Sequence, residues 1–223
     1  MKQSERSEAT QTRLLAVARE LFGSQGYEAT SIDDLVGAAG VTKGAFYHHF
    51  VDKRAIFRRV YEGAVRDVTE KVHASAVHAT CAIERARAGC RAFLEACLDP
   101  MQQRIGLDDG PKVLGWATMR EIQWSYSLAL FEAVFEEAMA EGSLVRRAPV
   151  ALAHLFFGAL CEASVYIARA ARPQVALVEV MRELDEIMTG LVRPGREALR
   201  RSQPAAAPDL GDTPAIGGDA TPR

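Results

Sequence analysis

The stretch Thr30–Lys53, TSIDDLVGAAGVTKGAFYHHFVDK, carries the residue pattern that decides the fold. Ser31 precedes a short apolar helical repeat and stands three residues before an aspartate, which is the spacing of a capping box. Gly40 follows the repeat, where a glycine ends a helix in the left-handed conformation at low cost. Thr42 can then cap a second short helix, Lys43–His49. Two short helices joined by a tight glycine turn form a helix-turn-helix, whose second helix enters the major groove of DNA.

These residues also resemble a known family. The run V-T-K-G-A-F-Y-H-H-F followed by D-K (residues 41–50 and 52–53) is similar to the recognition helix and the next helix start of TetR-family transcriptional regulators. Upstream, R-L-L-A-V-A-R-E-L-F-x-x-x-G-Y-E-A-T (Arg13–Thr30) resembles the family's first helix and its connection. Downstream, Asp52–Tyr61 resembles the start of the long fourth helix, and D-G-P-K-V-L-G-W (Asp109–Trp116) is similar to one subset of the family. The match is specific up to about Tyr61, because three helices and their turns agree in order and spacing.

The helix positions and the resemblance together predict which residues contact DNA. The start of the second helix directs backbone N–H groups toward phosphate, and Gly44 permits close approach to base edges. The resemblance implies phosphate contacts for the polar tips of Tyr47 and His48, and it aims Lys53 at the DNA backbone. For Ser31, a role as helix cap alone stays equally open. The predicted DNA-binding residues are Thr30, Ser31, Thr42, Lys43, Gly44, Tyr47, His48 and Lys53.

The composition is typical of a soluble globular protein. Of the 223 residues, 48% are hydrophobic and 25% are charged, which is enough apolar surface for a substantial core. The net charge of −2 provides no global basic footprint for nucleic acid. Basic residues are nevertheless clustered at Lys53, Arg54, Arg58 and Arg59, where a dimer can present a local basic patch.

Two segments bear on localisation. The start of the chain, MKQSERSEAT, contains no apolar region, so no secretory signal is expected. The segment 149–168 has Glu162 as its single full charge and would be about 30 Å long as a helix. Its alanines, His154 and the proline at its start favour a helix that is buried on two sides. We therefore expect a soluble, cytoplasmic protein that does not span a membrane.

Residues that carry metal or catalytic chemistry are present without the spacing that such chemistry needs. The cysteines are Cys81, Cys90, Cys97 and Cys161. They form neither a CxxC motif nor a Cys/His zinc spacing, and we interpret them as small buried hydrophobic residues. No Ser/His/Asp set or nucleotide loop is apparent, and Glu121, Glu162 and His154 form an acid–base pair only by assumption. No metal, cofactor or enzymatic activity is predicted.

Apolar residues keep helical spacing almost throughout, so the predicted fold is all-α with about nine helices. Beyond the helix-turn-helix, helices are expected at about 7–24, 53–79, 83–98, 112–141, 149–172 and 174–192, with a loop at 99–111. A break near Trp124 stays open. We divide the chain into a helix-turn-helix DNA-binding domain (1–61, motif 31–50), a helical bundle for ligand binding and dimerisation (62–192), and a Pro/Ala/Gly-rich tail (193–223) predicted to be disordered.

The last two expected helices carry matching apolar stripes. Two such stripes brought together across a two-fold axis give a four-helix bundle, which predicts a homodimer. Because a stripe is more often intrachain core, the prediction rests on the apolar character of segment 149–168 on all sides. Two recognition helices must also reach grooves roughly 34–36 Å apart, which one head cannot do. The predicted interface residues are Leu152, Leu155, Phe156, Ala159, Ala163, Leu177, Met181, Leu184, Met188 and Leu191.

The resemblance further implies a cavity for a small organic molecule between the helix at 53–79 and the region 112–141. Such pockets are mostly apolar with a few placed polar groups, and Arg120, His73 and Glu162 are the candidate polar anchors. The predicted ligand-binding residues are His73, Phe93, Met101, Trp116, Met119, Arg120, Trp124, Phe131, Glu162 and Tyr166. Ordinary core packing is the alternative for each apolar member of this set.

The sequence therefore predicts a ligand-responsive, DNA-binding transcriptional regulator that binds a palindromic operator as a homodimer. Repression, with release from DNA by a small organic effector, is the default that the resemblance implies. Two other functions stay open: a DNA-binding dimer without an effector, and an enzyme built on a helical bundle. Ligand binding in a thermal-shift screen separates the first two functions, and DNA affinity separates both of them from the enzyme.

Overall fold

In the computed structural model the described residues are 3–192, and the tail predicted to be disordered, 193–223, lies outside them. Within this range the chain is helical, with one isolated antiparallel bridge between Leu144 and Val192 and no longer strand. The α-helices are α1 (Gln3–Gln25), α2 (Ile32–Ala39), α3 (Lys43–His49), α4 (Lys53–Ser75), α5 (Ala82–Ala96), α6 (Pro100–Gln102), α7 (Gly110–Leu114), α8 (Trp116–Ala140), α9 (Pro149–Arg169) and α10 (Pro173–Leu191). A π-helical segment, η1 (Gln103–Asp109), lies between α6 and α7. The predicted all-α class is confirmed.

The caps predicted for α2 and α3 are present. The Ser31 hydroxyl accepts a hydrogen bond from Asp34 N at 3.1 Å, and an Asp34 carboxylate oxygen accepts one from Ser31 N at 2.8 Å. Gly40 ends α2 with φ at +61°, which a residue with a Cβ adopts only with strain. The Thr42 hydroxyl accepts from Ala45 N at 3.2 Å and starts α3. Capping residues predicted from the local sequence therefore mark both ends of α2 and the start of α3.

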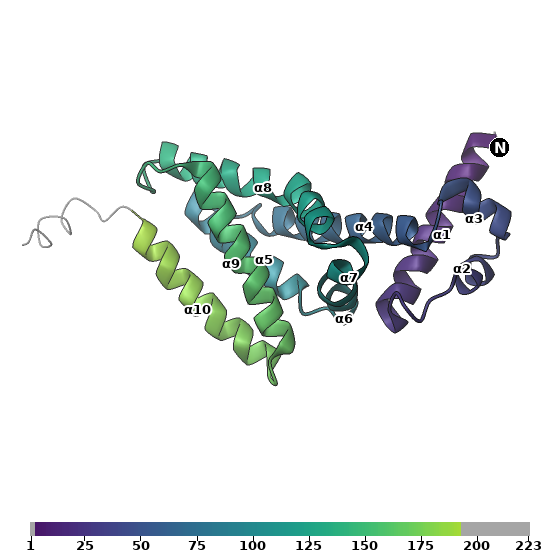
Figure 1. The fold of residues 1–223 in the computed structure, drawn as a ribbon. Coiled ribbons are helices and arrows are strands. Elements are labelled where there is room, and N and C mark those ends of the chain that lie inside the picture. The colour runs from purple at the N-terminus through teal and green to yellow at the C-terminus, as the bar shows by residue number, and fades with distance from the viewer. Residues whose placement is uncertain (1–2, 193–223) are drawn as a thin grey trace, which may run out of the picture. The chain divides into compact units, whose positions relative to one another are not determined.

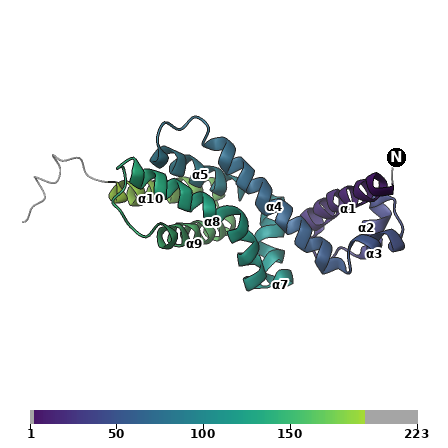
Figure 2. The same cartoon turned by 90° about the horizontal axis from the view of Figure 1, so that it is seen from above.

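An aromatic cluster holds these short helices to their neighbours. The rings of Phe22, Tyr27 and Phe57 lie with centroids 5.2–5.7 Å apart, and Phe22 and Phe57 are fully buried. Phe46 on α3 and Phe50, which directly follows this helix, are buried in the same cluster. Figures 1 and 2 both show α1, α2 and α3 gathered around one end of α4. We call this part, residues 3–61, the head, and residues 62–192 the body.

The apolar core of the head does not stop at residue 61. Its buried cluster continues through Tyr61 and Ala64 of α4 into η1, α7 and the first half of α8. The body residues in this cluster are Ala64, Ile105, Leu114, Met119 and Ile122. Packing is therefore continuous across the predicted boundary between the two domains, a boundary that stays a prediction.

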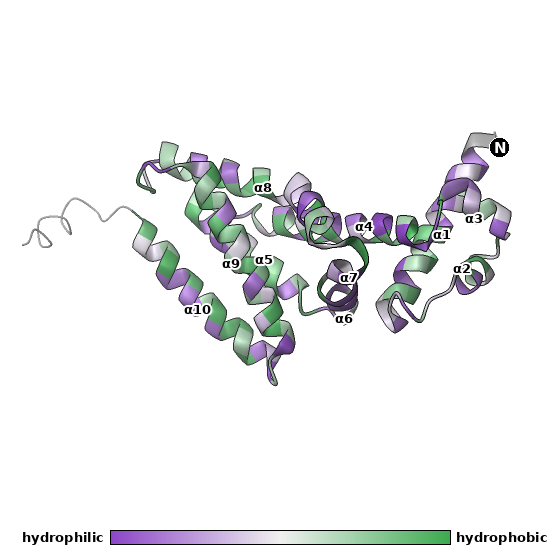
Figure 3. Ribbon diagram, in the orientation of Figure 1, coloured by the Kyte–Doolittle hydropathy of each residue, from purple (hydrophilic) through white to green (hydrophobic). Residues whose placement is uncertain are grey.

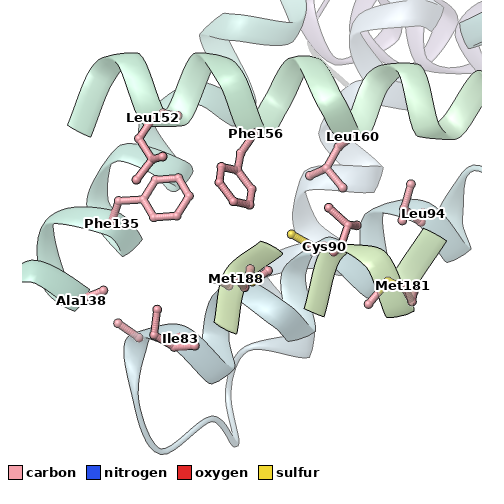
Figure 4. Packing of buried hydrophobic residues seen from close by; sticks show 14 of the residues in the cluster. Ile83, Cys90, Leu94, Phe135, Ala138, Leu152, Phe156, Leu160, Met181 and Met188 are labelled. Atoms are coloured by element: carbon pink, nitrogen blue, oxygen red, sulfur yellow. The ribbon is translucent and has the colours of Figure 1, made fainter. Parts of the chain in front are cut away.

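A second buried cluster fills the far part of the body. It joins α5, the end of α8, α9 and α10. Figure 4 shows Leu152, Phe156 and Leu160 pointing from α9 into the space bounded by α8, α5 and α10. Along α10, hydrophobic positions alternate with hydrophilic ones (Figure 3), because only one face of this helix is buried in the chain.

The segment 99–111 differs from the loop that its Pro and Gly residues predicted, because it forms α6 and η1 and leads into α7. Pro100 lies in the first turn of α6 and Pro111 in that of α7, where a missing N–H breaks no helical hydrogen bond. The Asp99 carboxylate accepts a hydrogen bond from Met101 N at 2.8 Å and caps α6. The helix expected at 112–141 is interrupted at Gly115, whose φ is +79°, and continues without a break past Trp124.

Helix α9 is long and apolar enough to cross a membrane, judged by length and composition alone. Ala153, Leu160 and Ile167 on one side of it are fully buried against the rest of the chain. Since the core helix of a soluble protein passes the same test, this property is weak evidence for a membrane span.

Candidate DNA-binding surface and ligand cavity

Helix α3 presents most of the predicted DNA-binding residues on one exposed surface. Thr42, Lys43, Gly44, Tyr47 and His48 are all exposed, and Tyr47 has 54% of its surface accessible. A Cβ added to Gly44 would meet nothing closer than the Thr42 hydroxyl at 3.8 Å, so the backbone at this position is open to a close partner. The surface combines a capped helix N-terminus, a cation and two polar rings, which is a suitable set for phosphate contacts.

The Lys43 ammonium is paired within the head. It lies 2.7 Å from an Asp33 carboxylate oxygen of α2, and both side chains are largely exposed. The hydrogen bond to Asp33 raises the pKa of Lys43, so the side chain stays charged. Because exposed ion pairs contribute little and are screened by salt, a DNA phosphate can replace Asp33 as the partner of Lys43.

Thr30 and Lys53 differ from the predicted picture of groups that face DNA. Thr30 is fully buried, and its hydroxyl donates to Gly26 O at 2.8 Å and accepts from Gln25 Nε2 at 3.1 Å. The Lys53 ammonium donates to Tyr27 O at 2.8 Å and to Thr30 O at 2.9 Å, and it lies 4.1 Å from the Tyr27 ring centroid. Thr30 thus holds the turn between α1 and α2, and Lys53 ties this turn to α4.

The basic residues after Lys53 are also engaged within the chain. Arg54 donates to Val113 O at 2.9 Å and to Leu114 O at 3.2 Å, which connects α4 to α7. Arg58 and Arg59 each lie 3.1 Å from a carboxylate oxygen of Glu62. Within the charge cluster, backbone carbonyls therefore hold Arg54, whereas Arg58 and Arg59 pair with Glu62 and stay about half exposed.

A cavity of about 190 Å³ lies in the body, between α4, α5, η1, α8 and α9. Its wall includes five of the predicted ligand-binding residues: Phe93, Trp116, Met119, Arg120 and Glu162. The lining residues that sequence reasoning missed are Tyr61, Ala64, Val65, Val68, Cys97, Gln102, Gln103, Gly106, Leu107, Pro111, Gln123, Ser127, Phe157, Gly158, Cys161, Ser164 and Val165.

The other five predicted ligand-binding residues lie away from this cavity. His73 is exposed near the end of α4, and Tyr166 is 55% exposed on α9. Trp124 is 43% exposed and meets His154 edge to face, with ring centroids 5.1 Å apart. Met101 packs against the core of the head, and Phe131 packs into the second cluster. Helical spacing placed these residues on helix faces that could line a cavity, but in the packed chain these faces meet solvent or other parts of the core.

Most polar groups of the cavity wall come from α8 and α9, and α4 contributes the Tyr61 hydroxyl. Gln123 Nε2 donates to the Tyr61 hydroxyl at 2.9 Å, whereas the buried Gln123 Oε1 accepts no hydrogen bond within residues 3–192. Burial raises the pKa of Tyr61, so the phenol stays neutral and keeps its proton. Gln123 follows Arg120 by one helical turn, and a glutamine amid the apolar positions of this helix was the signal in the sequence that could have identified it.

Arg120 is enclosed by rings rather than by carboxylates. Its guanidinium carbon lies 4.6 Å from the Trp116 ring centroid and 5.6 Å from that of Phe157. Its NH1 group lies 3.5 Å from the Cys161 sulfur, a weak acceptor. Burial raises the pKa of Cys161, and it raises that of Cys97 to about 12, so both thiols of the wall are neutral.

The segment η1 is shared by the cavity and the head. Gln103, Gly106 and Leu107 line the cavity, and at the end of the same segment Asp109 accepts a hydrogen bond from Tyr27 N at 2.8 Å. Just before η1, Met101 packs so closely on α1 that a Cβ added to Gly23 would lie 2.2 Å from its Cγ. One short segment therefore both lines the cavity and contacts the turn that leads into the helix-turn-helix.

Most residues of the predicted dimer interface are buried inside the chain. Leu152 and Phe156 of α9 face the second cluster, as do Met181 and Met188 of α10 (Figure 4). Leu177 and Leu184 of α10 belong to the same cluster. Ala163 and Leu191 are half-buried against the same cluster, and Ala159 is exposed. Leu155 differs, because 71% of its surface is accessible. The stripes identified in the sequence thus pack against their own chain, and the exposed apolar residues on the same two helices are Val150, Leu155, Tyr166, Val175, Val178 and Ile187.

Comparison with known proteins decides the family. Residues 14–60 match the family model described as bacterial regulatory proteins, tetR family, and residues 83–191 match the tetracyclin repressor-like C-terminal domain. A crystal structure of a TetR-family transcriptional regulator from Pectobacterium atrosepticum superposes with a TM-score of 0.75 and 33% identity, covering 88% of this chain and 100% of that one. The chain belongs to the TetR family.

Other relatives of this TetR-family protein match over shorter or more divergent stretches. The transposon Tn10 TetC protein of Escherichia coli is 28% identical over 144 residues, which are 64% of this chain and 72% of TetC. The transcriptional regulator AcrR of Shigella flexneri is 40% identical over 72 residues, which are 31% of this chain and 34% of AcrR. RolR, solved in complex with resorcinol, has a TM-score of 0.64 at 17% identity over 92% of this chain and 99% of RolR, a likeness that shows the fold alone.

Family membership assigns the overall function. The protein is a DNA-binding transcriptional regulator with an N-terminal helix-turn-helix and a helical C-terminal portion. TetR-family regulators are soluble DNA-binding proteins, so the soluble fold expected from composition agrees with the family.

Proposed function

We propose that the protein is a cytoplasmic repressor that binds a palindromic operator as a homodimer and leaves it when a small organic effector occupies the cavity in the body. The observation that carries this proposal is the position of η1, which lines the cavity with Gly106 and Leu107 and holds the head through Asp109. A molecule that displaces η1 acts on the Tyr27 turn without any flexible linker in between.

The DNA contacts in this proposal come from α3 and its cap. Thr42, Lys43, Gly44, Tyr47 and His48 are exposed together, which supports direct contact with phosphates and base edges. Ser31 stays a candidate DNA contact because it is exposed at the start of α2, whereas the buried Thr30 is not proposed as a contact. Lys53 uses two of its three N–H donors on carbonyls of the head and keeps one for a phosphate.

The homodimer is proposed to form through the exposed face of α9 and α10. Leu155 and Tyr166 lie on one stripe of α9, and Val178 and Ile187 are exposed on α10. Large apolar side chains that share a surface mark interaction sites, and two copies of this helix pair related by a two-fold axis make a four-helix bundle. Dimerisation is also needed to place recognition helices at two half-sites roughly 34–36 Å apart.

Release from DNA requires that the effector binds the DNA-incompetent conformation more tightly than the DNA-bound one. The cavity wall includes Tyr61 and Val65 of α4, so an occupant also bears on the helix that continues from the head. The complex of RolR with resorcinol supports a small effector, because that protein shares the fold of this chain. Repression is supported by the repressor name of one relative, KstR2 of Rhodococcus jostii, which is 37% identical over 60 residues.

Neither alternative has comparable support. A regulator without an effector would have no ligand to fill the cavity and none to donate a hydrogen bond to the buried Gln123 oxygen. For an enzyme, the candidate acid–base residues are Glu121, Glu162 and His154. All three are exposed, and within residues 3–192 no hydrogen bond or ion pair joins any two of them. We propose no catalytic activity.

Selection of binding sites from random DNA followed by affinity measurement at fixed salt tests the DNA-binding part of the proposal. Tyr47→Ala and Lys43→Ala are expected to weaken binding about tenfold on all sequences, as loss of phosphate contacts does, and Lys43→Ala should flatten the salt dependence. Tyr126→Ala and Lys71→Ala, which remove exposed residues of the same types from the body, are the matched controls. Unchanged affinity in both α3 variants would exclude this surface.

Lys53→Ala is expected to weaken DNA binding and to lower thermal stability together, because it removes two hydrogen bonds of the head. A loss of stability without any loss of DNA affinity would limit Lys53 to a structural role.

A further inference from the structure

The volume of the cavity limits the size of its occupant. Apolar cavities of about 150 Å³ accept a benzene molecule, and the cavity measures about 190 Å³. A single ring with one or two small substituents therefore fits this volume, whereas a fused polycyclic molecule or a long acyl chain would extend beyond it. Tyr61, Phe93, Trp116 and Phe157 contribute rings to the wall, which suits a flat aromatic occupant.

Arg120 supplies a cation that has no anionic partner. Within residues 3–192 no carboxylate lies close enough to form an ion pair with it, and its nearest acceptor is the Cys161 sulfur at 3.5 Å. A guanidinium group presents parallel N–H donors that match a carboxylate in a bidentate geometry. The flanking rings of Trp116 and Phe157 hold the guanidinium in place, so little side-chain freedom is lost when an anion binds.

Gln123 supplies an acceptor that also has no partner. Its Oε1 is buried without a hydrogen bond, which is costly unless a ligand or a water molecule donates to it. Its amide nitrogen donates to the Tyr61 hydroxyl, which leaves the amide oxygen as the atom without a partner. Arg120 and Gln123 lie three residues apart on α8, and the Cβ atoms of such a pair are about 5–6 Å apart, on the order of the width of one ring.

We propose that the cavity binds a one-ring aromatic carboxylic acid that also carries a hydroxyl group, with the carboxylate on Arg120 and the hydroxyl donating to Gln123 Oε1. This inference rests on the proposed function, in which the cavity holds the effector. The substituents lie on separated ring positions, because the hydroxyl of a 2-hydroxy acid donates to its own carboxylate and is then not available to Gln123 Oε1.

Glu162 lines the same cavity and would favour a cationic ligand instead. Its side chain is exposed, however, whereas Arg120 is half-buried between rings. Charges that are partly shielded from water interact more strongly with a ligand than exposed charges do. Arg120 is therefore the anchor that determines the sign of the ligand charge.

Titration calorimetry with the full-length protein and defined probes tests the inference. The probes are 3-hydroxybenzoate, 4-hydroxybenzoate, 2-hydroxybenzoate, benzoate, phenol, benzamidine and decanoate. The 3- or 4-hydroxy acid is expected to bind most tightly, followed by benzoate, with phenol and benzamidine at least tenfold weaker than the best acid. Tighter binding of benzamidine would make Glu162 the anchor and overturn the proposal, and so would tighter binding of phenol or decanoate.

Two variants test the contributions of Arg120 and Gln123 to ligand binding separately. Arg120→Gln is expected to weaken binding of the tightest-binding acid about tenfold or more and to remove the preference for benzoate over phenol. The control is Arg169→Gln, at an exposed arginine of α9, which should leave that affinity and that preference unchanged. Gln123→Met should abolish the preference for hydroxybenzoate over benzoate while benzoate still binds. Circular dichroism confirms that each variant is folded. Retention of both preferences in the folded variants would contradict the proposal.

Operator affinity measured without any probe distinguishes failure of this inference from failure of the proposed function. If the protein binds an operator and a neutral or cationic probe releases it, the proposed function stands and the assigned ligand class is wrong. If aromatic acids bind through Arg120 but leave operator affinity unchanged, the ligand class stands and the proposed control of DNA binding fails.

Discussion

The surface of α3 and the wall of the cavity present polar groups in opposite ways. On α3 the polar groups are exposed, and the one cation, Lys43, already has a carboxylate partner in Asp33. In the cavity the cation Arg120 is half-buried between two rings, and within residues 3–192 the buried acceptor Gln123 Oε1 has no hydrogen-bond partner. Exposed paired groups exchange one partner for another at little cost, whereas buried unpaired groups gain strongly from a matching ligand.

The difference indicates how each region reaches its specificity. In the proposed function, binding at α3 sums many weak contacts over two copies of the head and therefore depends on salt. Binding in the cavity depends on a few groups in a small volume, where one mismatched polar group is costly. The two regions also share one apolar core, so they are not independent mechanically.

The largest expected effect concerns Leu184, which belongs to the predicted interface but has only 6% of its surface exposed, in the core of its own chain. Leu184→Glu should prevent stable folding, because it buries an unpaired carboxylate. Leu155→Glu, at a residue that is 71% exposed, should give a folded monomer. Sedimentation velocity and circular dichroism measure both outcomes. A folded, monomeric Leu184→Glu protein together with a dimeric Leu155→Glu protein would reverse the assignment of the two faces.

Phe57→Ala tests whether the head and the body unfold together. Phe57 is fully buried in the cluster that continues to Met119 and Ile122, and its truncation should cost about 3–5 kcal/mol. Both tryptophans of the chain, Trp116 and Trp124, lie on α8, so their fluorescence reports on the body alone. In urea at fixed protein concentration, the fluorescence transition is expected to shift with the whole-chain circular dichroism transition. A loss of helicity at lower urea concentration, with the fluorescence transition unchanged, would show that the head unfolds independently of the body.

The sequence predicted the head well because its determinants are local. A capping box, a left-handed glycine and a hydroxyl cap lie within Ser31–Thr42, and each acts on residues at most four positions away. The buried role of Thr30 escaped this reasoning, since its hydrogen bond to Gly26 O is indistinguishable in sequence from an exposed hydroxyl next to a cap.

The cavity was predicted only in part because long-range contacts build it. Tyr61 and Gln123 meet across 62 positions, and no local pattern pairs them. The apolar stripe of α10 posed a different problem. Periodicity identified Leu184 and Met188 as a buried face, but an intrachain core and a dimer interface require the same pattern, and only the packed structure separates them.

Asp109→Ala tests the connection between cavity and head. It removes the acceptor of Tyr27 N and leaves a donor of the head without its partner, at a cost of about 1–3 kcal/mol. Operator affinity should respond less to the effector in this variant. Asp109→Asn keeps an acceptor oxygen and should preserve most of the response. The measurement is the ratio of operator affinities with and without effector. Equal ratios in the alanine variant and the unaltered protein would exclude this route of coupling.

The smallest expected effect distinguishes a helix cap from a DNA contact at Ser31. Ser31→Ala removes the cap and should lower the melting temperature by about 2–4 °C. Ser31→Gly costs only a few tenths of a kcal/mol at a cap position, so the melting temperature is largely preserved, but it removes the hydroxyl that would meet a phosphate. Weaker operator binding by Ser31→Gly, with nearly unchanged stability, would assign Ser31 to the DNA surface. Operator affinity equal to that of the unaltered protein in both variants would limit Ser31 to capping.

The pH dependence of Ser31→Ala provides an internal check on the cap. Hydrogen bonds from the Ser31 hydroxyl and backbone lower the pKa of Asp34 from its ordinary value of 3.8. Stability from a lowered carboxyl pKa is fully present above the ordinary value and is lost as the pH falls through the lower folded-state value. The difference in melting temperature between Ser31→Ala and the unaltered protein should therefore be constant near neutral pH and shrink below about pH 4. A difference that persists in acid would mean that Ser31 stabilises α2 without the carboxylate of Asp34.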